Sequence, residues 1–147
     1  MKKYVLDTNL YIRAFRSEEG KRAMQQYLAG FTPSTFLSSV VAHELLVGTN
    51  TDSKARDIHN HVIEPLRRVG RLITPSHEAW TEAGEAIAKM ARKGKRDLST
   101  IPKSLVHDYL LAASCRESGM TLVTENVSDF KEVRRQLRFE FVAPWPK

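Results

Sequence analysis

Four acidic residues stand where folded chains usually place apolar side chains or end a strand. Asp7 follows a short apolar run, which predicts a buried strand, and Asp129 lies in the turn after a second such run at 121–124. Glu44 and Asp108 fall within apolar stripes of predicted helices. A carboxylate in such a stripe is costly unless a cation compensates its charge. These four residues are therefore the first candidates for chemistry.

Glu44 lies in a predicted helix over Val40–Val47, where Val40, Val41 and Val47 share its face at spacings of three and four residues. The end of such a stripe also reaches solvent in many helices of two turns. The pattern is therefore typical either of a functional carboxylate held in an apolar face or of a surface residue at its margin.

Asp108 is also a carboxylate in an apolar stripe, and its predicted helix is more apolar than that of Glu44. Leu105, Asp108, Ala112 and Cys115 follow one stripe at steps of three, four and three, and the remaining surface is also mostly apolar. Burial of Asp108 is therefore expected. Its place in about the first turn offers a second explanation that needs no burial, because the helix dipole favours an anion there.

Asp7 and Asp129 are also ordinary cap or turn residues, and either alone is explained that way. Both nevertheless follow strands, and the carboxyl ends of parallel strands meet at one edge of a sheet. Helices beside those strands would bring Glu44 and Asp108 to the same edge. Four carboxylates without histidine or cysteine ligands favour hard cations, Mg²⁺ or Mn²⁺. Such ions clamp a phosphodiester and activate a water.

Strands and helices alternate along the chain, which predicts an α/β fold with a central, mostly parallel β-sheet flanked by helices. The 147 residues fit one domain, residues 1–147. Ligands of such sheets bind beyond the carboxyl ends of the strands. The predicted strands are 4–6, 35–38, 72–73, 121–124 and 139–142; the predicted helices are 9–15, 18–28 closed by Gly30, 40–47, 51–69, 76–92, 104–117 capped by Ser104, and 127–136.

The composition excludes several classes of protein. Hydrophobic residues make up 41% of the chain, which rules out disordered and fibrous proteins. Seven scattered glycines form no phosphate-binding loop or dinucleotide motif. His43-Glu44 begins like a zinc-protease helix, but Val47 occupies the place of the second histidine. A lone Cys115, no apolar run of membrane length and no recognisable targeting segment lead us to expect a cytoplasmic protein without membrane contact.

The net charge of +6 favours a polyanionic partner, nucleic acid first, although many basic proteins bind none. Basic residues cluster at 67–71, 89–103 and 131–138, and each cluster also fits a solvated surface. We expect RNA contacts from two of these clusters, through Lys93, Lys95, Arg96, Arg134 and Arg135.

Four segments resemble the PIN-domain ribonucleases, and most closely the VapC-like toxins of toxin–antitoxin pairs. Each segment is weak evidence alone, but together they occur in the family's order and span nearly the whole chain. The segments are Tyr4-Val5-Leu6-Asp7-Thr8-Asn9, Ser38-Ser39-Val40-Val41-Ala42-His43-Glu44-Leu45, His107-Asp108-Tyr109-Leu110-Leu111-Ala112-Ala113 and Leu122-Val123-Thr124-Glu125-Asn126-Val127-Ser128-Asp129-Phe130.

The resemblance implies a single PIN domain and an endoribonuclease that hydrolyses RNA with a water activated by Mg²⁺ or Mn²⁺. It implies that Asp7, Glu44, Asp108 and Asp129 are both the catalytic residues and the metal ligands. Polar support would come from Thr8, Thr124 and Asn126. Members of the family often form homodimers and are silenced by a cognate antitoxin protein. The generous stretch 52–103 leaves the RNA target open.

Two other functions fit parts of the sequence. A non-catalytic RNA-binding or adaptor domain could keep the same fold. An aspartyl-phosphate enzyme of the haloacid dehalogenase type would use Asp7 as its nucleophile, but that motif needs an aspartate where Asn9 stands.

The first two predicted helices carry more apolar residues than one small core requires. We expect some of them to be exposed and to bind the antitoxin or a second copy of the chain. The alternative is that all of them pack inside. The residues are Tyr11, Ile12, Phe15, Met24 and Tyr27.

Overall fold

The computed structural model describes residues 1–147 and has a five-stranded sheet at its centre. The strand order is β3-β2-β1-β4-β5, and all four pairings are parallel. The expected α/β fold with a parallel sheet is therefore confirmed. The strands are β1 (Tyr4–Leu6), β2 (Thr35–Ser38), β3 (Leu72–Ile73), β4 (Thr121–Val123) and β5 (Glu140–Val142).

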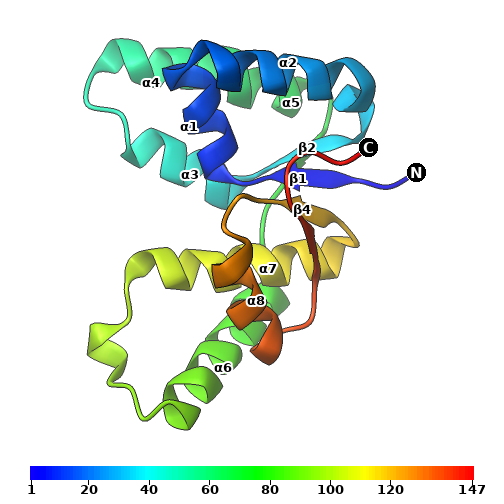
Figure 1. Cartoon of the computed structure of the whole chain (residues 1–147). Helices are drawn as coiled ribbons and strands as arrows, with labels where there is room; N and C mark the ends of the chain where they lie inside the picture. The colour runs from blue at the N-terminus through cyan, green and yellow to red at the C-terminus, as the bar shows by residue number, and fades with distance from the viewer.

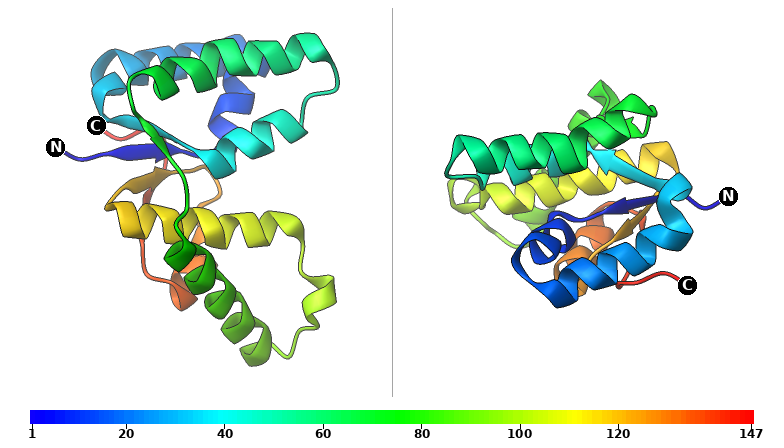
Figure 2. Two further views of the ribbon diagram at one scale, coloured as in Figure 1. Left: turned by 180° about the vertical axis from the view of Figure 1, so that it is seen from behind. Right: turned by 90° about the horizontal axis from the view of Figure 1, so that it is seen from above.

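Helices cover both faces of the sheet, as a parallel sheet requires. Figure 1 shows α1, α2, α4 and α5 on one side of the sheet and α6, α7 and α8 on the other, and the left view of Figure 2 shows the same division from behind. The helices are α1 (Thr8–Arg16), α2 (Glu18–Phe31), α3 (Ser39–Val47), α4 (Asp52–Ile58), α5 (Glu64–Arg68), α6 (His77–Lys93), α7 (Lys103–Ser118) and α8 (Val127–Gln136).

The central strands and α7 form the core. Every residue of β1 and β4 is buried, and so is every residue of α7 from Tyr109 to Cys115. The α7 helix is enclosed because it lies under the sheet and packs against α6 and α8 (Figure 1). This explains why its sequence is apolar on nearly every face rather than along one stripe.

The register of the sheet places two side chains together at its carboxyl edge. Leu6 of β1 pairs with Val123 of β4, and the ladder continues past both strands. The Asp7 amide donates to the Val123 carbonyl at 2.9 Å, and the Thr124 amide donates to the Val142 carbonyl at 3.0 Å. Asp7 and Thr124 are therefore neighbours as a direct consequence of strand pairing.

Two predicted helix boundaries were wrong. The α2 helix continues through Gly30 and ends at Phe31, shortly before Pro33. The α7 helix begins at Lys103 with Pro102 as its N-cap, so Ser104 lies inside the first turn. The serine therefore caps nothing.

The predicted helix over 51–69 is divided into three parts. A π-helical segment, His59–Ile63, separates α4 from α5. Pro65 explains the break, because its ring would crowd the carbonyl of the preceding turn and it has no N–H to donate. A wider π-turn accommodates such a residue without ending the helix.

Within the described chain, no helix combines the length and the apolar character that crossing a membrane would require.

The junction between α1 and α2 depends on a close backbone approach. A Cβ at Gly20 would lie 2.5 Å from the Arg13 carbonyl oxygen. We expect Gly20→Ala to lower the free energy of unfolding by roughly 1–3 kcal/mol through overpacking. Gly30→Ala is the matched control, since nothing lies within 4 Å of its added methyl group. It should stabilise α2 by roughly 0.5–1 kcal/mol. Urea unfolding measures both, and equal effects would contradict the close approach.

Candidate active site

Asp7 is a buried carboxylate with two hydrogen-bond donors. Its Oδ1 accepts from the Thr8 amide at 2.8 Å, and its Oδ2 accepts from the Thr124 hydroxyl at 2.7 Å. Burial raises the pKa of Asp7 above its usual value, and the charges of Glu44 and Glu125 raise it further, whereas the two hydrogen bonds oppose the rise. Asp7 is therefore held in one orientation in a place that disfavours its charge.

Thr8 connects Asp7 to Glu44. Its hydroxyl donates to Glu44 Oε1 at 2.9 Å, while its amide binds Asp7. The other carboxylate oxygen of Glu44, Oε2, lies 3.7 Å from Nδ1 of His107. The His107 ring in turn meets His43 edge-on, with ring centroids 5.4 Å apart. Glu44 is thus half-buried between the start of α1 and α7.

Asp108 projects from α7 into the negative field of the other carboxylates. Burial, followed by the charges of Asp7, Glu44 and Asp129, raises the pKa of Asp108 to about 7. It is the sixth residue of α7, so it lies in the second turn rather than the first. The helix dipole, which falls off within the first turn, therefore explains an acidic residue at position 108 less well than a functional role does. Asp108 lies half-buried among like charges instead.

Asp129 and Asn126 belong to the turn after β4 and the start of α8. Asp129 is exposed in the first turn of α8, yet its charge is one of those acting on Asp108. The backbone amide of Asn126 donates to the Thr124 hydroxyl at 3.0 Å, and its side chain caps nothing. The structure therefore brings all four predicted carboxylates to one edge, where Thr8 donates to Asp7 and Glu44 and Thr124 donates to Asp7.

The donor set matches a hard divalent cation in its chemistry. In this structure no three histidine, cysteine, aspartate or glutamate side chains are arranged so that they could hold a metal ion by themselves. Mg²⁺ usually keeps several waters and uses only one or two carboxylates, so a closed protein cage is not required. No basic side chain is among the causes of the raised pKa of Asp7 or Asp108. A cation would supply the missing compensation.

Two groups at this edge were not predicted from the sequence. Glu125 follows Thr124 directly, acts on Asp7 through its charge and forms an ion pair with Arg13 of α1. His107 adjoins Asp108 in the sequence, but its proximity to Glu44 depends on how α3 and α7 pack. The position of Glu125, immediately after a strand, was a signal that the sequence offered.

The five predicted RNA-contacting residues lie on α6, α8 and the loop after α6, and most of them have partners. Lys93 Nζ lies 3.4 Å from Gln136 Oε1, which joins the ends of α6 and α8 into one surface. The Arg134 guanidinium stacks over the Phe141 ring at 4.5 Å, and Arg135 forms an ion pair with Glu132. The exposed loop residues are Lys95 and Arg96.

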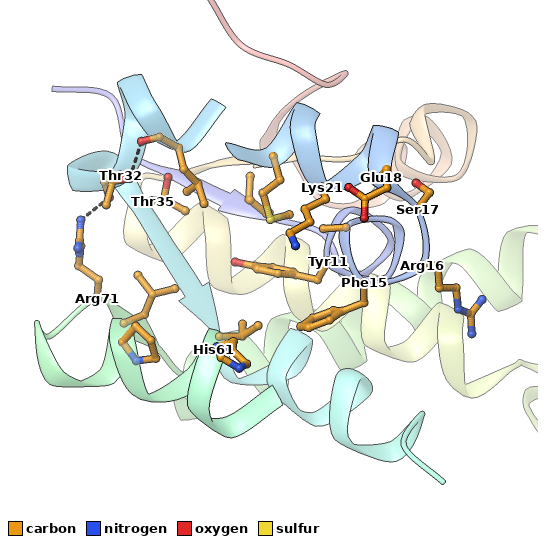
Figure 3. A pocket seen from close by; sticks show the side chains of 17 residues that line it. Tyr11, Phe15, Arg16, Ser17, Glu18, Lys21, Thr32, Thr35, His61 and Arg71 are labelled. Carbon is orange, nitrogen blue, oxygen red and sulfur yellow. Dashed lines mark hydrogen bonds between the residues drawn. The ribbon is translucent and has the colours of Figure 1, made fainter. Parts of the chain in front are cut away.

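A large cavity of about 680 Å³ opens between α1, α2 and the helical segment 59–68. Figure 3 shows Tyr11 and Phe15 projecting from α1 toward the segment that carries His61. Cations line its rim, and the Arg71 guanidinium donates to the Thr32 carbonyl at one end. Those cations are Arg16, Lys21 and Arg71.

Of the five apolar residues of α1 and α2, some of which were expected to be exposed, three are buried and only Phe15 is clearly exposed. Tyr11, Met24 and Tyr27 are buried, because α2 folds back over α1 and the sheet. Tyr27 also stacks between Phe31 and Trp145. Ile12 is partly buried, and Phe15 remains 49% exposed.

A family model for the PIN domain matches residues 4–136, and the chain belongs to the PIN domain family. No curated protein matches the chain.

Several solved structures share this fold over nearly the whole chain. The DNA-bound VapBC from Salmonella typhimurium has a TM-score of 0.69 at 21% identity, over 97% of this chain and 98% of that one. FitAcB from Neisseria gonorrhoeae has a TM-score of 0.68 at 18% identity, and the match covers 98% of this chain and 99% of that one. VapBC2 from Rickettsia felis, bound to a promoter DNA fragment, has a TM-score of 0.62 at 20% identity, and the match covers 97% of this chain and 98% of that one. At these identities the likeness concerns the fold.

The raised pKa of Asp108 predicts how the stability of the metal-free protein depends on pH. The usual value for an aspartate is 3.8, so the folded state binds this proton more tightly than the unfolded state. The contribution of Asp108 to stability is therefore greatest below about pH 4 and is lost as the pH rises to about 7. Asp108→Asn should raise the Tm in EDTA at pH 8 by several degrees, with little effect near pH 4.

The matched control is Glu85→Gln on the exposed surface of α6, which should change the Tm little at either pH. Thermal unfolding across this pH range measures the effect. An Asp108→Asn variant that is less stable than the parent protein at pH 8 would contradict the placement of Asp108 among like charges.

Proposed function

We propose that this protein is a metal-dependent endoribonuclease and the toxin component of a toxin–antitoxin pair. The observation that supports this most directly is the meeting of four carboxylates from four elements, none of which forms an ion pair with a lysine or an arginine. Like charges at one edge are unfavourable for folding, so their presence points to a ligand of opposite charge. PIN-family membership and the resemblance to VapC-like toxins agree with this function.

In this proposal Asp7, Glu44, Asp108 and Asp129 hold Mg²⁺ or Mn²⁺. When bound, the ion supplies positive charge for the phosphodiester and a more acidic water. Thr124 and Thr8 orient the two oxygens of Asp7, and Thr8 orients Glu44. Because these bonds exist before any ligand arrives, the site needs little reorganisation on binding.

Asp108 has a different role, because its proton affinity depends on what occupies the edge. With a pKa of about 7, its carboxyl group is partly protonated near neutrality in the absence of a cation. A bound cation favours the ionised form. Ion binding should therefore release a proton near pH 7, and activity should increase as the pH rises through this range.

An antitoxin partner is part of the same proposal, and the likeness to the VapBC and FitAcB structures supports it. The large cavity offers an apolar floor of Tyr11, Phe15 and Met24 beneath a rim of cations. An apolar segment of the antitoxin that carries acidic residues would fit it. An arginine of the same segment could enter the acidic edge and neutralise it.

Asp7→Asn and Asp108→Asn should each lower RNA cleavage at least 100-fold while the protein stays folded. Each substitution removes a negative charge that binds the cation, but leaves a side chain of the same shape. The assay follows cleavage of bulk RNA with Mg²⁺ or Mn²⁺, and EDTA should abolish it. Full activity of either variant would refute the site. A wild-type protein that binds RNA but never cleaves it would favour the adaptor alternative.

Charge substitutions at the two aromatic residues of α1 test the antitoxin contact. Phe15→Glu should leave the Tm nearly unchanged, because this side chain is 49% exposed, and should weaken antitoxin binding at least tenfold. Tyr11→Glu should unfold the protein, because Tyr11 is only 6% exposed. Calorimetry with the co-expressed antitoxin measures affinity. A folded Phe15→Glu variant with unchanged affinity would count against this docking surface.

A further inference from the structure

A second hollow lies directly against Glu44 and has no role in the site described above. It has a volume of about 400 Å³ and opens between α1, the end of α3 and α4. We call it the Glu44 pocket. Its lining is Ile12, Phe15, Arg16, Glu44, Leu45, Gly48, Thr49, Lys54, Asp57 and Ile58.

The Glu44 pocket has two cations without partners. Arg16 of α1 and Lys54 of α4 are exposed, and neither side chain makes an ion pair or hydrogen bond in the structure. Arg13, one turn before Arg16, is by contrast paired with Glu125. The cationic groups at this pocket are therefore free to bind an anion that reaches the carboxylate edge from this side.

The pocket also has an aromatic wall. Phe15 is 49% exposed, which is unusual for a phenylalanine in a helix that otherwise packs on the core, and partly buried Ile12 lies one turn before it. Exposed aromatic rings beside cations are the elements that bind single-stranded nucleic acid, through base stacking and phosphate contacts. Thr49 and Asp57 add polar groups that can accept hydrogen bonds from a base.

We propose that the Glu44 pocket binds the nucleotide adjacent to the scissile phosphate of a single-stranded RNA. Phe15 stacks on the base, and Arg16 and Lys54 contact its phosphate. Because Glu44 forms part of the wall, the neighbouring phosphate lies at the carboxylate edge. The inference rests on the proposed ribonuclease function and names a substrate-binding site for it, on the opposite side of the sheet edge from the predicted basic loop.

The unpaired cations of this pocket favour RNA over a purely apolar peptide, because phosphates can contact them. Arg16 and Lys54 have no ion-pair partner, and they are matched in number by the two carboxylates of the lining, Glu44 and Asp57. Lys54 lines the Glu44 pocket but not the large cavity, whereas Lys21 lines the large cavity but not the Glu44 pocket. These two lysines therefore form a matched pair that separates the two hollows.

The test measures binding of a labelled, mixed-sequence single-stranded RNA of about 12 nucleotides to the full chain. An Asp108→Asn background in Mg²⁺ prevents cleavage. Lys54→Ala and Arg16→Ala should each weaken binding several-fold and lower the slope of log affinity against log salt by about 0.7. Phe15→Ala should weaken binding about tenfold without changing the slope. Lys21→Ala should change neither, and circular dichroism verifies the fold of each variant.

Unchanged affinity and slope in both Lys54→Ala and Arg16→Ala would overturn the proposal, as would an RNA that fails to bind the parent protein. An apolar peptide site is indicated instead if Phe15→Ala weakens antitoxin binding and leaves RNA binding unaffected. The nuclease proposal is judged separately, by cleavage with the wild-type chain. Loss of RNA affinity in Lys54→Ala without any cleavage by wild type would support the pocket and reject the nuclease.

Discussion

The mutual repulsion of carboxylates at one sheet edge is the constraint on which the rest of this structure depends. Asp7, Glu44, Asp108 and Asp129 come from four separate elements; the charge of Glu44 raises the pKa of Asp7, and the charges of Asp7, Glu44 and Asp129 raise the pKa of Asp108. Only a firm scaffold keeps such groups together. Strand pairing places Asp7 beside Thr124, and two threonine hydroxyls fix the carboxylates that they contact. The parallel sheet therefore holds together a cluster of charges that is electrostatically unfavourable by itself.

The same cluster links stability to ligand binding. A carboxyl group whose pKa lies near 7 contributes less to the stability of the metal-free protein at neutral pH than in acid. Any cation that binds the folded state recovers this free energy by mass action. The α7 helix can carry such a residue because its remaining turns, Tyr109 to Cys115, are enclosed by the core. Strong packing in one half of the helix therefore supports an unfavourable charge in the other.

The α1 helix is the structural link between the acidic edge and both hollows. Asp7 caps its start, Arg13 pairs with Glu125, and Phe15 and Arg16 line both the large cavity and the Glu44 pocket. In the proposed function, an antitoxin in the large cavity and an RNA in the Glu44 pocket would contact the same two side chains. Inhibition would then follow from overlap of two binding surfaces and would need no conformational change in the toxin.

The sequence alone determined the fold class, nearly every strand and helix, and which four carboxylates meet at one edge of the sheet. These features follow from local patterns: alternating apolar runs, acidic residues after strands and acidic residues in apolar helix stripes. Helix boundaries at Gly30 and Ser104 were missed, since both residue types also occur inside helices. The long-range hydrogen bonds from Thr124 to Asp7 and from Thr8 to Glu44 were decided only by tertiary structure. The contact of His107 with Glu44 and the burial of Tyr11, Met24 and Tyr27 depend on how distant helices pack. Packing geometry is a long-range property that no local spacing encodes, and it also created the Glu44 pocket.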